Sequence, residues 1–267
     1  MRPTTTESDY FLKYHYFWEF MPKNLNTYDG KMLVSEIRGG DYAHPGEELL
    51  IEIVLKRLSI LPNDILLDAG SGLGGTAAYI QSKTSAKIVG IDIDKDAITY
   101  SKRKYPFCDF YRGRIEDVGK SFKIKFQYIF CFCSLYCCNS IDGCFASLSS
   151  AINLNGSIII SDYACHNREL FKMQSVMNDT PFTVIDYLQA AEKANCHLHY
   201  FSDITDRYLT WFDDLIVKIE KFILKTHSPT THNAACEVKK KCMDIQKALR
   251  EDSLRGVIME FRQKPLP

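Results

Sequence analysis

The residues best suited to chemistry in this chain are glycines that follow an aspartate. Residues 66–75 read Leu-Leu-Asp-Ala-Gly-Ser-Gly-Leu-Gly-Gly, and the apolar run ends at Asp68. The apolar residues predict a buried strand, and the glycines predict a sharp turn from it into a helix. Because glycine lacks a Cβ, such a turn lets a ligand lie directly against the main chain. Open α/β sheets bind ligands at the carboxyl ends of their strands, so this stretch predicts a binding loop.

A second acid supports a nucleoside ligand at this loop. Residues 87–94, Lys-Ile-Val-Gly-Ile-Asp-Ile-Asp, predict a second strand that ends at Asp92. A carboxylate there can accept hydrogen bonds from both ribose hydroxyls, as in dinucleotide-binding domains, where it follows the glycines by roughly 20 residues. NAD therefore stays an alternative. The spacing Gly70-x-Gly72-x-Gly74 differs from the dinucleotide pattern G-x-G-x-x-G and resembles the first motif of class I S-adenosyl-L-methionine (AdoMet) methyltransferases.

Length and charge limit the function classes. With 267 residues, we expect one α/β domain with additions. Basic and acidic residues number 33 each, and this balance argues against a nucleic-acid partner, which needs an excess of basic contacts. No stretch has the length of a membrane span, and Met1–Asp9 lacks a signal-peptide core. The expected protein is cytoplasmic, has no membrane span, and has an oligomeric state that the sequence does not indicate.

Ten cysteines raise the question of a metal site. Four of them crowd one segment, at positions 131, 133, 137 and 138. A zinc site usually shows two separated ligand pairs with short internal spacing, whereas Cys133-x-x-x-Cys137 supplies one pair at most. We therefore expect reduced thiols in the core and the pocket, and no metal.

Strand and helix signals alternate after Pro62, which is typical of a parallel α/β sheet. The predicted strands cover 64–68, 87–92, 107–111, 125–132, 157–162, 197–204 and 257–262. The predicted helices cover 74–84, 94–104, 140–152 and 182–195. Asn153–Gly156 reads as a turn between a helix and a strand.

Further helices are expected outside this core. The first 55 residues have a helical, aromatic pattern and predict a cap over the cofactor cleft. The apolar spacing within 206–250 predicts about two helices before the final strand. We expect an N-terminal helical cap at 1–55 and an AdoMet-binding core at 56–205. A helical insertion at 206–250 and a last strand at 251–267, which completes the core, are expected to follow.

With these elements in place, the chain resembles class I methyltransferases acting on small molecules, most of all the phosphoethanolamine- and sarcosine-type amine N-methyltransferases. The similarity runs from about Tyr28 to Pro265 and rests on five stretches: 38–46, 66–75, 90–93, 160–163 and 203–206. It implies a Rossmann-like seven-stranded α/β sheet. It also implies AdoMet-dependent methyl transfer to a small molecule, with an amine nitrogen as the expected acceptor.

The resemblance also implies site residues. Contacts to AdoMet are expected from Tyr42, Ala43, Asp68, Gly70, Ser71, Gly72, Asp92, Ile93, Ile115 and Cys133. Catalytic roles are expected for Tyr28, His44 and Tyr163, with Tyr163 at the position that contacts the substrate head group in that family.

Two positions depart from the family pattern. Arg114 stands where an acid usually takes the adenine amino group, although Glu116 or Asp117 can reach it after a small shift. Cys137 stands where the phosphoethanolamine enzymes have a histidine as general base, and a buried thiol is a poor base near neutral pH. His44 or His15 can substitute from the cap, or the amine arrives deprotonated and needs no base.

Three other functions compete with amine methylation. The aromatic cap allows methylation of oxygen or carbon on a lipophilic acceptor. Arg114 and Cys137 favour a catalytically inactive relative that acts as a binding or scaffolding module. Nucleic-acid methylation requires a basic groove, which the neutral composition does not indicate.

Overall fold

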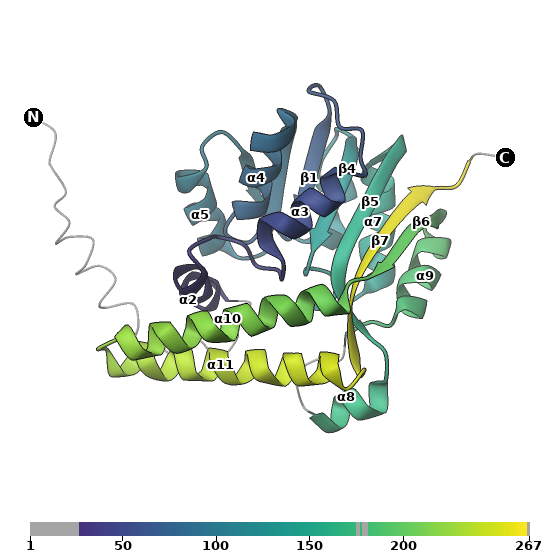
Figure 1. Cartoon of the computed structure of the whole chain (residues 1–267). Helices are drawn as coiled ribbons and strands as arrows, with labels where there is room; N and C mark the ends of the chain where they lie inside the picture. The colour runs from purple at the N-terminus through teal and green to yellow at the C-terminus, as the bar shows by residue number, and fades with distance from the viewer. Residues whose placement is uncertain (1–26, 175–176, 178–180, 266–267) are drawn as a thin grey trace, which may run out of the picture.

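Seven strands form one sheet in the part of the chain that the computed structural model describes, residues 27–174, 177 and 181–265. The strands are β1 (Ile65–Ala69), β2 (Lys87–Asp92), β3 (Asp109–Arg112), β4 (Phe126–Phe132), β5 (Ile152–Cys165), β6 (Cys196–Asp203) and β7 (Leu254–Gln263). Their order across the sheet is β3-β2-β1-β4-β5-β7-β6 (Figure 1). The first five strands pair in parallel, and β7 is antiparallel to both β5 and β6. The predicted seven-stranded Rossmann-like sheet is confirmed.

Helices cover both faces of this sheet (Figure 1). They are α2 (Tyr28–Arg38), α3 (Glu47–Leu55), α4 (Gly75–Thr84), α5 (Lys95–Lys104), the 3₁₀ turn η2 (Ile115–Asp117), α6 (Val118–Ser121), α7 (Ile141–Ala151), α8 (Arg168–Gln174), α9 (Val184–Lys193), α10 (Thr205–Lys225) and α11 (Pro229–Arg250). Successive side chains of a strand point to opposite faces, so Leu66 and Leu67 enter two separate apolar clusters, both fully buried. Two covered faces explain why the strands read as continuous apolar runs.

The predicted turn at Asn153–Gly156 is wrong, because these residues form the first part of β5. Ile152 already pairs with Phe126, and the register then shifts before Tyr128 pairs with Ser157. A Cβ on Gly156 would lie 2.5 Å from the carbonyl oxygen of Gln127, so glycine is needed for this close approach of the two strands. The polar residues and the glycine therefore mark an irregular start to the strand rather than a turn.

Two long helices, α10 and α11, occupy the region where the apolar spacing predicts about two helices. They pack against each other as an antiparallel pair that runs beneath α2 in Figure 1. Ser228 caps α11 by accepting a hydrogen bond from the N–H of Thr231, and Pro229 occupies the first turn. The aromatic part of the predicted N-terminal cap, residues 10–20 including His15, lies outside the described residues. Within the described residues, no helix combines the length and apolarity that a membrane crossing requires.

Candidate functional site

A cavity of about 420 Å³ opens where the carboxyl ends of the parallel strands meet α2, α10 and α11. One end is formed by the glycine loop and the segments after β2 and β3, with Gly70, Gly72, Asp92, Ile93 and 113–116. The other end is mainly apolar and aromatic, and its walls include Val34, Tyr163, Trp211, Phe212, Leu215 and Ile245. The loop after β4 lines the space between these ends with Cys133, Ser134 and 136–139.

The glycine loop adopts a backbone that other residues rarely take. The φ angles of Gly70, Gly72 and Gly74 are 91°, 51° and 89°. The N–H groups of Gly70 and Ser71 donate to the carbonyl oxygen of Ile91 at 2.8 and 2.9 Å, which ties the loop to β2. A Cβ on Gly72 would meet nothing nearer than 3.7 Å, so the main chain is open to the cavity at this residue. This is the surface against which a ligand can lie.

Replacing Gly70 with alanine is expected to lower the free energy of unfolding by roughly 2–4 kcal/mol, from backbone strain and a steric clash. The new Cβ would lie 2.4 Å from the Cβ of Ser134. Gly39 provides the matched control, because its φ is 79° and a Cβ there would meet nothing within 4 Å. Gly39→Ala should therefore lose only the strain, roughly 1–2 kcal/mol. Urea unfolding of both variants measures the difference, and equal losses would contradict the clash.

Asp92 connects the end of β2 to the loop and to the cap. Its Oδ2 accepts from the N–H of Gly72 at 2.8 Å, and its Oδ1 accepts from the N–H of Asp94 at 2.9 Å. The Nζ of Lys31 lies 3.5 Å from Oδ1 of Asp92 and 3.9 Å from Oδ2 of Asp94. Lys31 comes from α2 and was not predicted, because no local motif links it to a strand tip distant in sequence.

Three buried polar atoms near the loop have no hydrogen-bond partner within the described chain: Oδ2 of Asp68, Oγ of Ser71 and Oγ of Ser134. Burial and then the charge of Asp92 raise the pKa of Asp68 to about 7. Asp68 itself does not line the cavity and lies behind the glycine loop at the end of β1. An acceptor without a donor fits a ligand that brings donors or positive charge to this end of the cavity.

The predicted cap residues Tyr42, Ala43 and His44 all line the cavity. His44 is 2% exposed and stacks on Phe132 with ring centroids 4.9 Å apart. Its Nδ1 lies 3.1 Å from the carbonyl oxygen of Pro45, and its Nε2 lies 3.1 Å from Oγ1 of Thr76. Burial lowers the pKa of His44 to about 3, so this geometry favours a neutral structural histidine over a general base.

Arg38 shapes the apolar end of the cavity, although no role was predicted for it. Its Nε donates to Glu47 at 2.7 Å, and its Nη1 and Nη2 donate to the carbonyl oxygens of Tyr42 and His44 at 2.6 and 2.7 Å. The guanidinium carbon lies 4.5 Å from the ring centroid of Trp211. Arg38 thus joins α2, the loop after it and α10, which are the three segments that close this end.

Tyr163 is brought to the cavity, whereas Tyr28 is not among its lining residues. The Tyr163 ring packs edge-to-face on Tyr136 and Tyr208, with centroids 5.5 and 5.3 Å apart. The Tyr28 ring instead packs on Tyr100, with centroids 6.3 Å apart. Of the two predicted tyrosines, only Tyr163 is therefore among the residues that line the cavity.

Asp162 holds the loop after β4 in place. It is fully buried and accepts hydrogen bonds from the N–H groups of Leu135 and Tyr136 at 2.9 and 3.0 Å. It also accepts from the N–H of Tyr163 at 2.8 Å and from the hydroxyl of Tyr187 at 3.3 Å. The loop carries Cys137, whose thiol pKa is raised to about 12, chiefly by burial. That thiol keeps its proton near neutral pH and cannot accept another.

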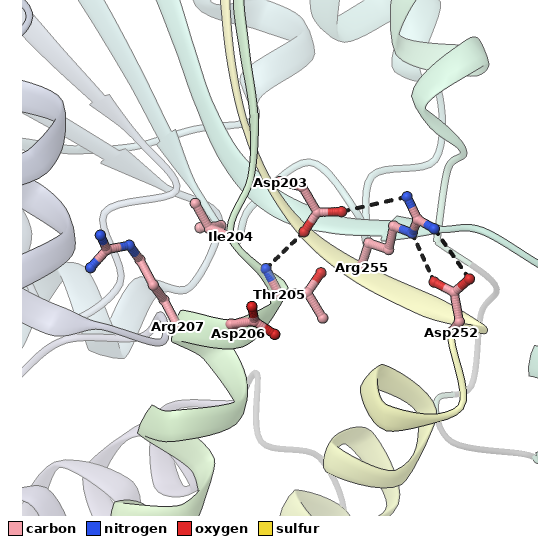
Figure 2. Close-up of a pocket in the computed structure, with 7 residues that line it drawn as sticks. All are labelled: Asp203, Ile204, Thr205, Asp206, Arg207, Asp252 and Arg255. Carbon is pink, nitrogen blue, oxygen red and sulfur yellow. Dashed lines mark hydrogen bonds and ion pairs between the residues drawn. The ribbon is translucent and has the colours of Figure 1, made fainter.

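A second cavity, about 570 Å³, lies at the start of α10 and is polar (Figure 2). Arg255 pairs with both oxygens of Asp252 and lies 3.5 Å from Asp203, which in turn accepts from the N–H of Thr205. Arg255 thus pairs with the two acids, so these three charges are already satisfied within the protein. Neither the glycine loop nor Asp92 lines this second cavity. The first cavity is therefore the better candidate for a reaction.

Residues 60–214, more than half of the chain, match the family described as methyltransferase domain. Over 88 residues the chain is 35% identical to the probable cobalt-precorrin-6B C(15)-methyltransferase (decarboxylating) of Methanococcus vannielii, covering 31% of this chain and 48% of that protein. Over 85 residues it is 31% identical to the phosphoethanolamine N-methyltransferase of Plasmodium falciparum, covering 32% of each. The chain thus spans half or less of these curated relatives.

Among solved structures, phosphoethanolamine N-methyltransferase 2 of Haemonchus contortus, in complex with phosphomonomethylethanolamine and S-adenosylhomocysteine, superposes with a TM-score of 0.78. The match covers 93% of this chain and 60% of that one at 17% identity. At this identity the likeness shows a shared fold.

Proposed function

Because this chain belongs to the methyltransferase-domain family, we propose that it binds AdoMet in the first cavity and transfers the methyl group to the nitrogen of a small amine. The observation that carries the proposal is the division of the cavity. Its polar end has a bare glycine backbone and a carboxylate at the tip of β2, and its other end is enclosed by apolar and aromatic side chains. The two ends suit a nucleoside and a small acceptor respectively.

The residues at the polar end fit AdoMet. Asp92 can accept hydrogen bonds from ribose hydroxyls, and the open main chain at Gly72 can lie against the ligand. The carboxyl of Asp68 lies behind the glycine loop and outside the cavity lining, so it favours a positively charged methionine part through the loop and without direct contact. Ile93 and Ile115 line the cavity where an adenine ring would pack. When bound, AdoMet supplies an electrophilic methyl group on a sulfonium.

The acceptor end favours an amine that enters without a proton. Among the described lining residues, the carboxylates are Asp92 and Glu116, and both lie at the polar end. An ammonium ion would therefore lose its hydration without gaining a counter-ion, which lowers its pKa and favours the neutral amine. The neutral nitrogen has the lone pair that attack requires, and the methylated product releases its proton to water. The protein positions two reactants and excludes water, so neither His44 nor Cys137 needs to act as a base.

Binding of AdoMet is expected to strengthen as pH rises towards 7. Asp68 has a pKa of about 7 in the free protein, and a cation bound across the glycine loop from it favours its ionised form, so binding below that pH must release a proton. Linkage then predicts up to about a tenfold gain in affinity per pH unit below the pKa. Calorimetric titrations between about pH 5 and 7 measure this slope. Asp68→Asn cannot release the proton and should show a flat profile, and a flat wild-type profile would contradict the assignment.

A second acceptor class, a lipophilic molecule methylated on oxygen or carbon, is favoured by the apolar walls formed by Val34, Phe212, Leu215 and Ile245. The experiment that separates the two classes uses AdoMet with a labelled methyl group. Small primary amines are compared with alcohols of the same carbon skeleton, and Asp92→Ala is the inactive control. We expect label in the amines alone. Label in the alcohols would support the second class, and binding of AdoMet without transfer to any acceptor would support a non-catalytic binding protein.

A further inference from the structure

Three side chains with metal-ligating atoms meet beside the polar end of the cavity. They are Glu116 in η2, Cys138 in the loop after β4, and Cys144 in the first turns of α7. Their ligand atoms all lie within 4.8 Å of one another. Cys144 is fully buried and the other two are partly buried, and Glu116 and Cys138 also line the cavity. Glu116 follows β3, whereas Cys138 and Cys144 both follow β4, so no motif within one segment includes all three residues.

The neighbouring contacts hold this cluster together. A Cβ on Gly143 would lie 3.6 Å from Cγ of Glu116, so the glutamate packs directly on the first turn of α7. The Sγ of Cys138 donates to the carbonyl oxygen of Ser134 at 3.4 Å, which orients it within its loop. Oε1 of Glu116 accepts from Nη2 of Arg114 at 3.0 Å. Outer partners of this kind orient metal-ligating carboxylates in known sites.

Two sulfurs and one carboxylate oxygen are the donors that zinc and other thiophilic divalent ions prefer. In a tetrahedral zinc site the bonds of about 2.0–2.3 Å place neighbouring ligand atoms roughly 3.5 Å apart. The ligand atoms lie within 4.8 Å of one another, so their separations must shorten by about 1.3 Å at most, which rotations of the three side chains can supply. Solvent entering from the cavity can fill the fourth position.

We propose that Glu116, Cys138 and Cys144 form a binding site for a thiophilic divalent cation such as Zn²⁺, which links η2, the loop after β4 and α7. Both thiols lose their protons to water when the ion binds. The site then carries two thiolates, one carboxylate and one dication, a net charge of −1 that the guanidinium of Arg114 offsets. This accounts for an arginine at a position where the resemblance leads one to expect an acid. The ion acts as a cross-link in the cavity wall.

Titration of the reduced full-length chain with Zn²⁺ against a chromophoric chelator tests the site. We expect one ion per chain. Cys144→Ser should weaken binding by at least about 10- to 100-fold, the range seen when only an outer partner of a ligand is lost. Cys138→Ser should do the same, and Arg114→Ala should cost about tenfold through the orientation of Glu116. The matched control is Cys137→Ser, which removes the adjacent free thiol and should leave Zn²⁺ binding unchanged.

Co²⁺ supplies a second readout, because tetrahedral thiolate ligation gives it intense absorption bands. We expect these bands in the wild type and in Cys137→Ser, and not in Cys144→Ser. Circular dichroism of the variants without metal shows whether they are folded. Equal Zn²⁺ affinity in the wild type and Cys144→Ser would overturn the proposal. A Cys138–Cys144 disulfide in the protein as isolated, with no metal bound after reduction, would also overturn it. None of these readouts depends on methyl transfer.

Discussion

Asp92→Ala is expected to weaken the binding of AdoMet by about 100-fold or more. Hydrogen bonds to a charged group contribute roughly 1.5–3 kcal/mol each, and a carboxylate that holds two ribose hydroxyls makes two of them. The substitution also removes the acceptor for the N–H of Gly72, so the glycine loop loses one of its hydrogen bonds to β2. Calorimetric titration of AdoMet, and then of S-adenosylhomocysteine, measures the change.

Two further variants make this result specific. Asp96→Ala removes an exposed acid from the first turn of the neighbouring helix α5 and should bind AdoMet as the wild type does. Asp92→Asn keeps the shape and one acceptor oxygen, so an intermediate affinity is expected. Wild-type affinity in Asp92→Ala would contradict the proposed cofactor position.

Asp162→Ala is expected to lower the free energy of unfolding by about 3 kcal/mol or more. The carboxylate accepts three main-chain N–H groups and one hydroxyl, all in or beside the core. Removing it leaves these donors without an acceptor, and each unsatisfied buried donor costs roughly 1–3 kcal/mol. Urea unfolding should show a lower midpoint with an unchanged m-value.

The same variant should also weaken AdoMet binding, because the loop that Asp162 holds contributes Cys133, Ser134 and Tyr136 to the cavity. Asp162→Asn keeps one acceptor oxygen and should lose less stability. Asp142→Ala, which removes a half-exposed acid paired with Lys193, should lose no more than about 1 kcal/mol. A loss for Asp162→Ala as small as that for Asp142→Ala would show that the loop does not need the carboxylate.

The polar end of the cavity could be predicted from sequence because its signals are local. Positive φ angles at Gly70 and Gly72 are a property of the loop itself, and the apolar run before it identifies the strand. Asp92 ends the next apolar run, and parallel strands bring their carboxyl ends to one edge. The strand tips therefore meet wherever the sheet forms, and the predicted strand positions agree with the structure to within a few residues except at the start of β5.

The start of β5 and the place of Tyr28 were decided by pairing and packing between distant segments. Asn153–Gly156 has the composition of a turn, yet it lies within β5 as an irregularity between the Ile152–Phe126 and Ser157–Tyr128 pairs. Tyr28 has the position of an active-site tyrosine by resemblance, yet α2 turns its ring towards Tyr100. Local composition does not contain the partner, so neither outcome could be read from it.

The sequence by itself determined the sheet, the glycine loop and the acid at the tip of β2, because backbone sterics and apolar periodicity act over a few neighbouring residues. Only the tertiary structure decided that Lys31 reaches Asp92, that Arg38 lies on Trp211, and that Cys138 and Cys144 meet Glu116. Each of these contacts joins segments that come together through the burial of apolar faces. The hydrophobic effect is non-directional and does not depend on how far apart two segments lie in the sequence. The residue that completes such a site is therefore set by the packed fold and not by its neighbours in the chain.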